Sequence, residues 1–358
     1  MYVKSLDLLN FRNYRELSVE LDAGINIFYG ANAMGKTNIL EAVYLAGTSR
    51  SHRGSRDRDM IRLGEEEAHI RMHLMKNDND YRIDMHLKKS RAKGIAIGGV
   101  PIRRASELLE IASIVFFSPE DLNIIKEGPS ERRRFTDLLL CETDKIYLSA
   151  LTNYNKSLNQ RNRLLHDLYF EPSLERELDV WDEMLVNYGT MIIERRARFV
   201  QELEGIASGI HGNLTGGREE LTLRFEPNVE AALFRDRLFA GRQTDKKMKT
   251  TTSGPHRDDV CISVGGMDLR TYGSQGQQRT AALSLKLSEI KTLEKYIGSK
   301  PVLLLDDVLS ELDRDRQNYL LGSIADTQTL ITCTGLDEFV RNRFEADRVF
   351  HVVGGMIE

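Results

Sequence analysis

The sequence predicts an α/β fold with a mainly helical lobe inserted into it. Residues 1–125 and 250–358 combine apolar strand patterns with amphipathic helices, whereas residues 126–249 carry apolar residues mostly at helical spacing. We therefore expect the two outer segments to form one domain and the middle segment to form the inserted lobe. The chain has 358 residues, which is enough for two domains with a sizeable core.

The first segment is expected to be rich in strands. Alternating and purely apolar runs mark most of these strands, and Gly98-Gly99 is typical of the turn of a hairpin. One strong helix is expected to begin within residues 30–37, because apolar residues then recur at helical spacing. The expected strands cover residues 2–9, 16–21, 25–29, 69–75, 81–88, 95–97 and 100–102.

The middle segment is expected to form helices. Pro129 and Ser130 can begin one helix, a second is expected over residues 144–168, and a third follows a break at 171–173. Two antiparallel helices of about 25 residues would reach only about 40 Å. The lobe is therefore a short antiparallel helical arm or a simple helical subdomain, because a long coiled coil would need many more residues.

The last segment returns to strands and helices. Gly265-Gly266 predicts a hairpin between residues 260–264 and 267–272. A helix through residues 283–293 is followed by the apolar run 302–305, which is typical of a buried strand.

Composition limits the classes of function. The net charge is −4, so any binding to nucleic acid would depend on local clusters of Lys and Arg. No apolar run is long enough to cross a membrane, and the N-terminus alternates like a strand rather than a signal peptide. Cys141, Cys261 and Cys333 lack metal-ligand spacing, and we interpret them as buried or incidental thiols of a cytoplasmic protein.

The strongest motif is a glycine loop at residues 30–37, which fits the pattern G-x-x-x-x-G-K-T. An apolar strand precedes the loop and an amphipathic helix follows it. Backbone N–H groups and the helix N-terminus would surround phosphates, Lys36 would reach the β- and γ-phosphates, and the Thr37 hydroxyl would hold Mg²⁺. We therefore expect ATP and Mg²⁺ as ligands. The expected nucleotide-binding residues are Gly30, Ala31, Asn32, Ala33, Met34, Gly35, Lys36, Thr37 and Asn38.

Two carboxylates follow the apolar run 302–305. A phosphate-binding loop needs an acidic residue at the end of a neighbouring strand to orient the metal ion, and Asp306 is the candidate. Asp307 is the candidate for polarising the attacking water as a general base. A strand that ends in acidic residues is common by itself, so the assignment depends on the glycine loop.

A second possible phosphate site precedes these carboxylates by about 30 residues. A serine and a glycine at the start of an amphipathic helix can bind an anion through a hydroxyl, backbone N–H groups and the helix dipole. Because the glycine loop already covers one set of phosphates, this second site makes sense if it acts in trans on the nucleotide of a partner chain. Helix capping alone is the alternative explanation. The residues concerned are Ser274, Gln275, Gly276, Gln277 and Gln278.

These motifs, in this order, resemble the ABC/SMC ATPase superfamily and, within it, the RecF family of bacterial recombination mediators. The resemblance covers the whole chain and implies an ABC/SMC-type P-loop ATPase head with the inserted helical lobe. It rests on residues 10–14, 24–26, 30–42, 118–122, 128–135, 253–259, 274–278 and 305–313.

The resemblance implies an ATP-dependent homodimer in which each nucleotide lies between one glycine loop and the opposite Ser274–Gln278 segment. Such a dimer clamps duplex DNA near a single-strand gap and works with RecR and RecO to load the RecA recombinase. ATP would close the dimer, and slow hydrolysis would release it. The resemblance also suggests that Arg12 and Asn13 lie against the adenine or ribose, and a solvated strand end is the alternative.

Two departures from the wider superfamily concern hydrolysis. Asp307 stands where a catalytic glutamate is usual. Residues 332–334, directly after an expected strand over 329–331, stand where a histidine is usual. We therefore expect weak, DNA-stimulated ATPase activity. Lys36, Asp307 and Glu311 are the candidate catalytic residues, and either Asp307 or Glu311 would position the water.

Several basic side chains are candidates for DNA contacts, and those that follow the glycine-loop helix could instead face phosphates. Charged runs are usually solvated surfaces, so a structural or solvent-exposed role is the alternative for each of them. The candidates are Arg50, Arg53, Arg56, Arg132, Arg133, Lys246 and Lys247.

Two other classes of protein share parts of this pattern. The nucleotide-binding subunit of an ABC transporter would carry a smaller helical insertion, a glutamine loop and a switch histidine, none of which is apparent. A structural SMC-like cohesion protein would need hundreds of heptad residues, which the chain lacks.

Overall fold

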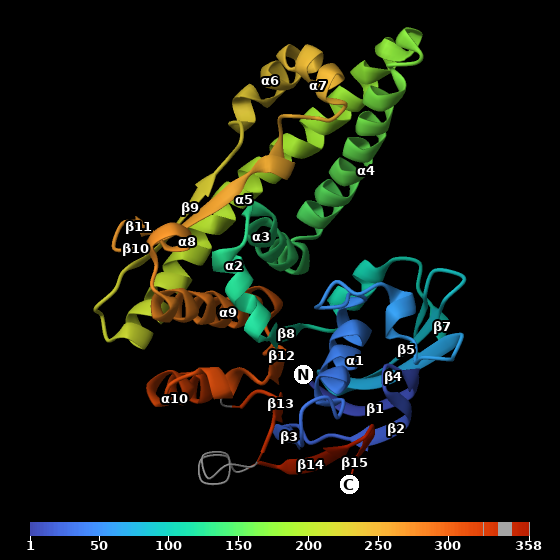
Figure 1. Ribbon diagram of the computed structural model, residues 1–358, viewed down its shortest axis with the longest axis vertical. Helices are drawn as coiled ribbons and strands as arrows, with labels where there is room; N and C mark the ends of the chain where they lie inside the picture. The colour runs from blue at the N-terminus through green and yellow to red at the C-terminus, as the bar shows by residue number, and fades with distance from the viewer. Residues whose placement is uncertain (325, 336–345, 358) are drawn as a thin grey trace. The chain divides into compact units, whose positions relative to one another are not determined.

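The computed structural model describes residues 1–324, 326–335 and 346–357, and Figure 1 shows its helices and strands. Contacts between residues divide the chain into two compact units. The first unit comprises Met1–Asp121 and Leu293–Glu358, and the second comprises Leu122–Thr292.

One sheet of the first unit is antiparallel. Its strand order is β2-β1-β4-β5-β6-β7. One face of this sheet is apolar because buried and more exposed residues alternate along β1, β4 and β5. The strands are β1 (Tyr2–Phe11), β2 (Tyr14–Glu20), β4 (Glu67–Lys76), β5 (Asn79–Lys88), β6 (Gly94–Ile97) and β7 (Val100–Pro101).

The other sheet of the first unit is mainly parallel. Its strand order is β15-β14-β3-β13-β12-β8, and only the β14–β15 pair is antiparallel. The central strands β12 and β13 are mainly apolar and almost entirely buried, as expected for strands covered on both faces. The strands are β3 (Ile25–Tyr29), β8 (Ile114–Phe117), β12 (Val302–Asp306), β13 (Thr329–Cys333), β14 (Arg348–Val353) and β15 (Met356–Ile357).

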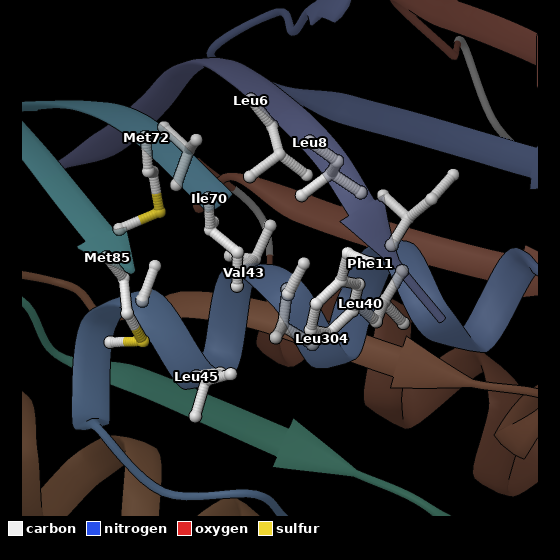
Figure 2. Packing of buried hydrophobic residues seen from close by; sticks show 14 of the residues in the cluster. Leu6, Leu8, Phe11, Leu40, Val43, Leu45, Ile70, Met72, Met85 and Leu304 are labelled. Atoms are coloured by element: carbon white, nitrogen blue, oxygen red, sulfur yellow. The ribbon is translucent and has the colours of Figure 1, made fainter. Parts of the chain in front are cut away.

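Helix α1 (Lys36–Thr48) lies between these two sheets and joins them into one core. Figure 2 shows Leu40 and Val43 of α1 close to Leu8 and Ile70 of the antiparallel sheet, with Leu304 of β12 in the same cluster. Burying each of these side chains contributes about 1.5–3 kcal/mol. The other helical elements of the unit are η1 (Asp57–Met60), η2 (Ala105–Glu110), η3 (Pro119–Leu122), η7 (Val308–Glu311) and α10 (Arg314–Ser323).

The second unit is mainly helical, with a small antiparallel sheet of order β11-β10-β9. Helices α4 and α5 run along each other (Figure 1). The helical elements are α2 (Asn123–Lys126), α3 (Pro129–Thr143), α4 (Lys145–Asp167), η4 (Pro172–Glu177), α5 (Leu178–Thr215), η5 (Ala231–Leu233), α6 (Phe234–Ala240), α7 (Arg242–Met248), η6 (Pro255–Arg257), α8 (Leu269–Tyr272) and α9 (Gln275–Ile297). The strands are β9 (Leu221–Glu226), β10 (Asp259–Val264) and β11 (Met267–Asp268).

The structure agrees with the expected start of α3 at Pro129 but differs in two other elements. Helix α5 has 38 residues rather than about 25, because its buried stripe continues as far as His211 and Thr215. The hairpin expected to reach residue 272 ends after the two-residue strand β11. The Asp268 side chain accepts a hydrogen bond from Thr271 N and so begins the short helix α8 there.

The second unit also extends beyond residue 249, where the sequence pattern placed the end of the lobe. It reaches Thr292 because β10 pairs with β9 along its whole length. In addition, Arg132 of α3 makes an ion pair with Asp259 of β10. These contacts join β10 to the helical segment rather than to the sheets of the first unit.

Among the described residues, no helix is both long and apolar enough to span a lipid bilayer.

Candidate nucleotide-binding site

The glycine loop connects β3 to α1 in a backbone conformation that needs glycine. Gly30 and Gly35 have φ values of 152° and 110°, and Ala33 also has a positive φ of 64°. A Cβ atom on Gly35 would lie 2.4 Å from the Asn13 side chain. No side chain that the structure describes caps the N-terminus of α1. Its first backbone N–H groups are therefore suited to bind an anion.

Lys36 is buried at the start of α1, inside the loop. Its Nζ atom donates hydrogen bonds to Gly30 O at 2.8 Å and to Ala31 O at 2.9 Å. The side chain therefore folds back onto the carbonyl groups of its own loop. This position is the one from which a lysine can contact the phosphates of a nucleotide.

Asn13 supports the loop from the β1–β2 turn. Its Nδ2 atom donates to Met34 O at 3.0 Å, and its Oδ1 atom accepts from Asn38 Nδ2 at 2.8 Å. The Tyr14 hydroxyl donates to Gly35 O at 3.1 Å. These contacts hold the loop in place, and the expected contact of Asn13 with the adenine or ribose stays a prediction.

Arg12 is engaged by residues of its own unit. Its guanidinium makes two hydrogen bonds of 2.8 Å to the buried carboxylate of Glu41 on α1. It also donates to Asp59 O and to the Ser55 hydroxyl. Burial alone would raise the pKa of Glu41, but the hydrogen bonds and charge of Arg12 outweigh it and lower that pKa. Arg12 therefore ties β1 to α1, and its side chain is only 21% exposed.

Asp306 and Thr37 come together at the carboxyl ends of the parallel strands. Thr37 Oγ1 donates to Asp306 Oδ1 at 2.7 Å. The sequence pattern suggested that β12 is the neighbour of β3. In the structure the two strands are separated by β13. Thr332 at the end of β13 fills this gap and donates to the same Asp306 oxygen at 2.7 Å. Ligand sites at this edge of a parallel sheet are the general rule.

The chemistry of this oxygen set fits Mg²⁺. A hydroxyl and one carboxylate are the few protein ligands that Mg²⁺ takes when phosphates and waters supply the rest. Thr332 orients the Asp306 carboxylate, a role that sequence reasoning missed. The available signal was that Thr332 directly follows an expected strand.

Asp307 follows β12 in a left-handed conformation, with φ at 53°. Its backbone N–H donates to Thr332 Oγ1 at 3.0 Å. Burial and the neighbouring Asp306 charge raise the pKa of Asp307, and the Lys36 charge opposes them. A raised pKa makes the ionised carboxylate a better proton acceptor. The side chain of Glu311, the other candidate, lies outside what the structure describes.

The Ser274–Gln278 segment lies in the second unit, at the start of α9. Gln277 N donates to Ser274 Oγ at 3.2 Å, and Ser274 N donates to Gln277 Oε1 at 3.0 Å. This reciprocal pair is a capping box. Gln278 is buried and donates to Leu269 O. Ser274, Gln275 and Gly276 are exposed.

The candidate DNA-binding residues fall into two groups. Arg132 is buried in a two-pronged ion pair with Asp259, and Arg133 donates to Asp258 O. Lys246 pairs with Glu175. These three side chains hold the second unit together. The exposed candidates are Arg50, Arg53, Arg56 and Lys247.

Arg53 differs from the other exposed candidates in its surroundings. Its guanidinium lies 4.0 Å from Asp306 Oδ2, and the side chain is 42% exposed. The structure therefore places Arg53 beside the carboxylate of the candidate metal site, and its contact with phosphates or DNA stays a prediction.

A parallel sheet, a glycine loop before α1 and an aspartate at the end of β12 define a P-loop ATPase head of ABC/SMC type. Residues 2–358 match the family RecF/RecN/SMC N terminal domain. The chain is 62% identical to "DNA replication and repair protein RecF" of Agathobacter rectalis, with 100% of this chain and 99% of that protein covered. It is 41% identical to the protein of the same name from Clostridium tetani, with 99% of each covered. The chain therefore belongs to the RecF family of DNA replication and repair proteins.

Solved structures agree with this assignment. A structure described as "recombination mediator protein RecF-ATP in RecFOR pathway" matches with a TM-score of 0.93 at 37% identity, covering 100% of this chain and 97% of that one. The Smc head domain of Pyrococcus furiosus matches with a TM-score of 0.57 at 18% identity, covering 100% of this chain and 95% of that chain, which supports the fold alone. The predicted fold class and family are thus confirmed.

Proposed function

We propose that this protein is an ATP-dependent DNA-binding protein that dimerises when it binds ATP and clamps duplex DNA near single-strand gaps in recombinational repair. The observation that carries the proposal is the convergence of Lys36, Thr37 and Asp306 around the N-terminus of α1. The relatives are RecF proteins rather than transporter subunits, which favours this function over an ABC transporter component.

ATP is the ligand best suited to this loop. The uncapped N-terminus of α1 and the Lys36 ammonium group supply positive potential for the β- and γ-phosphates. Thr37 and Asp306 would hold Mg²⁺ between them and the phosphate oxygens. A related RecF was solved with ATP, which supports the same ligand here.

The nucleotide site is completed by a second copy of the chain. Ser274 Oγ and the start of α9 are exposed, so another molecule's phosphates can approach them. A Cβ atom on Gly276 would meet nothing closer than Ser274 Oγ at 4.0 Å. Contacts of the described chain therefore do not require glycine there, whereas close approach of a partner's phosphate would. In the absence of a partner, the capping box holds the Ser274 hydroxyl at the N-terminus of α9.

Hydrolysis is slow and serves to release the clamp. Asp307 is the water-positioning residue, because it is partly buried beside Asp306 and its pKa is raised. Its side chain is one carbon shorter than the usual glutamate, so it holds water less closely. Thr332 orients Asp306 but, unlike a histidine, supplies no imidazole to the site. We further propose that DNA binding stimulates this weak activity.

The partners follow from the family. RecR and RecO would join this protein on gapped duplex DNA to promote RecA loading, in keeping with the pathway named for a solved relative. Arg50, Arg56 and Lys247 are the exposed candidates for phosphate contacts. Such a protein would work in the cytoplasm.

The experiment measures the oligomeric state by light scattering and the affinity for gapped duplex by fluorescence anisotropy, each with ATP, ADP or no nucleotide. ATP should shift the wild-type protein to a dimer and tighten binding to duplex DNA. Lys36→Ala should abolish both responses, whereas Lys89→Ala, on the exposed pair with Glu66, should keep them. An unchanged response of Lys36→Ala, or no effect of ATP on the wild type, contradicts the proposal.

A mixing experiment tests the composite site. Lys36→Ala and Gly276→Arg should each fail to dimerise alone, since each lacks one half of both sites. Their mixture should form heterodimers with one intact site, built from the loop of one variant and the α9 mouth of the other. If mixing restores nothing, the Ser274–Gln278 segment does not act in trans.

A further inference from the structure

The outer face of the antiparallel sheet carries a cluster of metal-ligating side chains. Glu67 and His69 are two residues apart on β4, so both point to the same face of the sheet. In the register of β4 and β5, His86 is directly opposite His69, and Lys88 is directly opposite Glu67. Opposite residues have Cβ atoms about 5 Å apart, which brings these side chains together.

The ligand atoms of Glu67, His69 and His86 are near enough to share one ion. His86 Nε2 lies 3.0 Å from Glu67 Oε2, and His69 Nε2 lies 3.9 Å from Glu67 Oε1. The two imidazole rings stack, with their centroids 4.0 Å apart. One ligand atom from each residue can be chosen so that all three lie within 4.8 Å of one another.

A cavity of about 550 Å³ opens on the same face of the sheet. His69 and His86 both line it, together with Asp7, Arg71 and Asp84. A ligand bound by the two histidines would therefore face an accessible space rather than the packed core. This cavity is formed within the first unit and is lined by β1, β2, β4, β5 and β6 residues together with Pro101 of β7.

We propose that Glu67, His69 and His86 bind a divalent transition-metal ion of the zinc class, with a fourth coordination position open toward the cavity. Two imidazoles and one carboxylate are ligands of this class, whereas Mg²⁺ and Ca²⁺ prefer oxygen alone. Metal–ligand bonds of about 2.0–2.1 Å place the ligand atoms of a tetrahedral site roughly 3.4 Å apart. The present separations of 3.0 Å and 3.9 Å from the Glu67 carboxylate bracket that value, so small side-chain rotations would complete the site.

Lys88 opposes metal binding in this arrangement. Its Nζ atom lies 2.7 Å from Glu67 Oε2, the carboxylate that the ion would take. A bound cation therefore displaces the ammonium group, and the two positive charges repel each other at close range. Replacing Lys88 by an uncharged residue should tighten the site, a result that a merely structural cluster would not produce.

The test is a titration of the purified protein with Co²⁺, followed by its visible absorption, in a buffer with excess Mg²⁺. Tetrahedral Co²⁺ with nitrogen ligands absorbs visibly, and Mg²⁺ occupies the oxygen sites without competing strongly for imidazole. One Co²⁺ should bind per chain, and Zn²⁺ should displace it. His69→Ala and His86→Ala should each weaken binding at least ten-fold, because even supporting residues of metal sites cost about that much.

His73 provides the matched control. It lies on β4, on the same face as His69, and pairs with Asp80 rather than with a second histidine. His73→Ala should leave Co²⁺ affinity unchanged, and Lys88→Met should raise it several-fold. Circular dichroism checks that each variant is folded. The proposal is overturned if the wild type develops no absorption band, if His73→Ala weakens binding as much as His69→Ala, or if Lys88→Met weakens it.

Discussion

The two units of this protein use buried charge in different ways. In the first unit, the large core around α1 is apolar. Its buried charged side chains among the described residues are Lys36, Glu41 and Asp306, all in or beside the candidate nucleotide site. The second unit instead buries arginines and aspartates in ion-pair networks that connect its helices.

Two arginines show how these networks work. Arg161 of α4 is fully buried, with Asp182 Oδ1 at 2.5 Å, Asp245 Oδ2 at 2.7 Å and the Thr251 hydroxyl at 2.8 Å. Arg196 of α5 contacts Asp137 and Asp258 in the same manner. A slender pair of helices encloses less apolar volume than a helix between two sheets. Directional ion pairs can then fix how the helices and loops meet, at a substantial cost in desolvation.

The largest effect is expected where a buried ion pair is broken. Arg161→Met leaves Asp245 and one face of Asp182 buried without their cation, so the free energy of unfolding should fall by about 3–5 kcal/mol. Urea denaturation measures it. Arg163→Met, on the same helix but 80% exposed, should change stability by less than about 0.5 kcal/mol. If both variants lose a similar amount of unfolding free energy, the buried ion pairs do not stabilise the second unit in the proposed way.

In the first unit, the matching experiment shortens an apolar side chain of the core. Leu40→Ala leaves a cavity in the apolar cluster of Figure 2 and should cost about 3 kcal/mol. Leu63 is fully exposed, so Leu63→Ala should be nearly neutral by the same denaturation assay. A loss below about 1 kcal/mol for Leu40→Ala would mean that this core relaxes around the missing atoms.

The stability of the second unit should depend on pH through His256 and Asp258, two neighbouring groups whose pKa values are shifted in opposite directions. Burial lowers the pKa of His256 to about 4 from 6.5, so its contribution to stability is present above pH 6.5 and is lost as the pH falls toward 4. Burial raises the pKa of Asp258 from 3.8 to about 6, so its contribution is present below 3.8 and is lost as the pH rises through 6. Each effect on the free energy of unfolding amounts to at most about 3 kcal/mol.

Variants can separate these two groups. The quantity measured is the unfolding free energy at about pH 7 minus that at about pH 4.5. His256→Gln should make this difference smaller, because the acid-sensitive imidazole, which accepts from Tyr154 OH, is gone. Asp258→Asn should make it larger. Shifts in the same direction would show that these groups do not titrate independently.

The smallest effect is expected at the carboxylate of the candidate metal site. Thr332→Val keeps the volume but removes the donor to Asp306 and the acceptor for Asp307 N, which should cost about 1–2 kcal/mol. Thermal unfolding of the nucleotide-free protein measures it. Thr334→Val, two residues further on and exposed, is the control and should leave the melting temperature unchanged. An unchanged melting temperature in Thr332→Val would mean that other groups take over its two hydrogen bonds.

The glycine loop could be predicted from the sequence because its chemistry is local. Positive φ values at Gly30 and Gly35, the following helix and Lys36 depend on residues that are adjacent in the chain. Most strands of the first unit were likewise expected close to their observed positions, since alternation is also a local pattern. The ends of helices and strands were harder to predict from the sequence. Helix α5 extends to Thr215, and α8 begins where the expected hairpin strand would continue.

Partnerships between distant residues were decided only by the tertiary structure. The order of the parallel strands places Thr332 between the loop and Asp306. The ion pair between Arg132 and Asp259 likewise joins residues that lie 127 positions apart in the sequence. A charged residue in a helical pattern has the same local signature whether it contacts solvent, DNA or a buried carboxylate. The sequence by itself thus determined the phosphate loop and the fold class, because backbone conformation and periodicity are local. Strand order, register and packing decided which side chains face one another, because those depend on the whole chain.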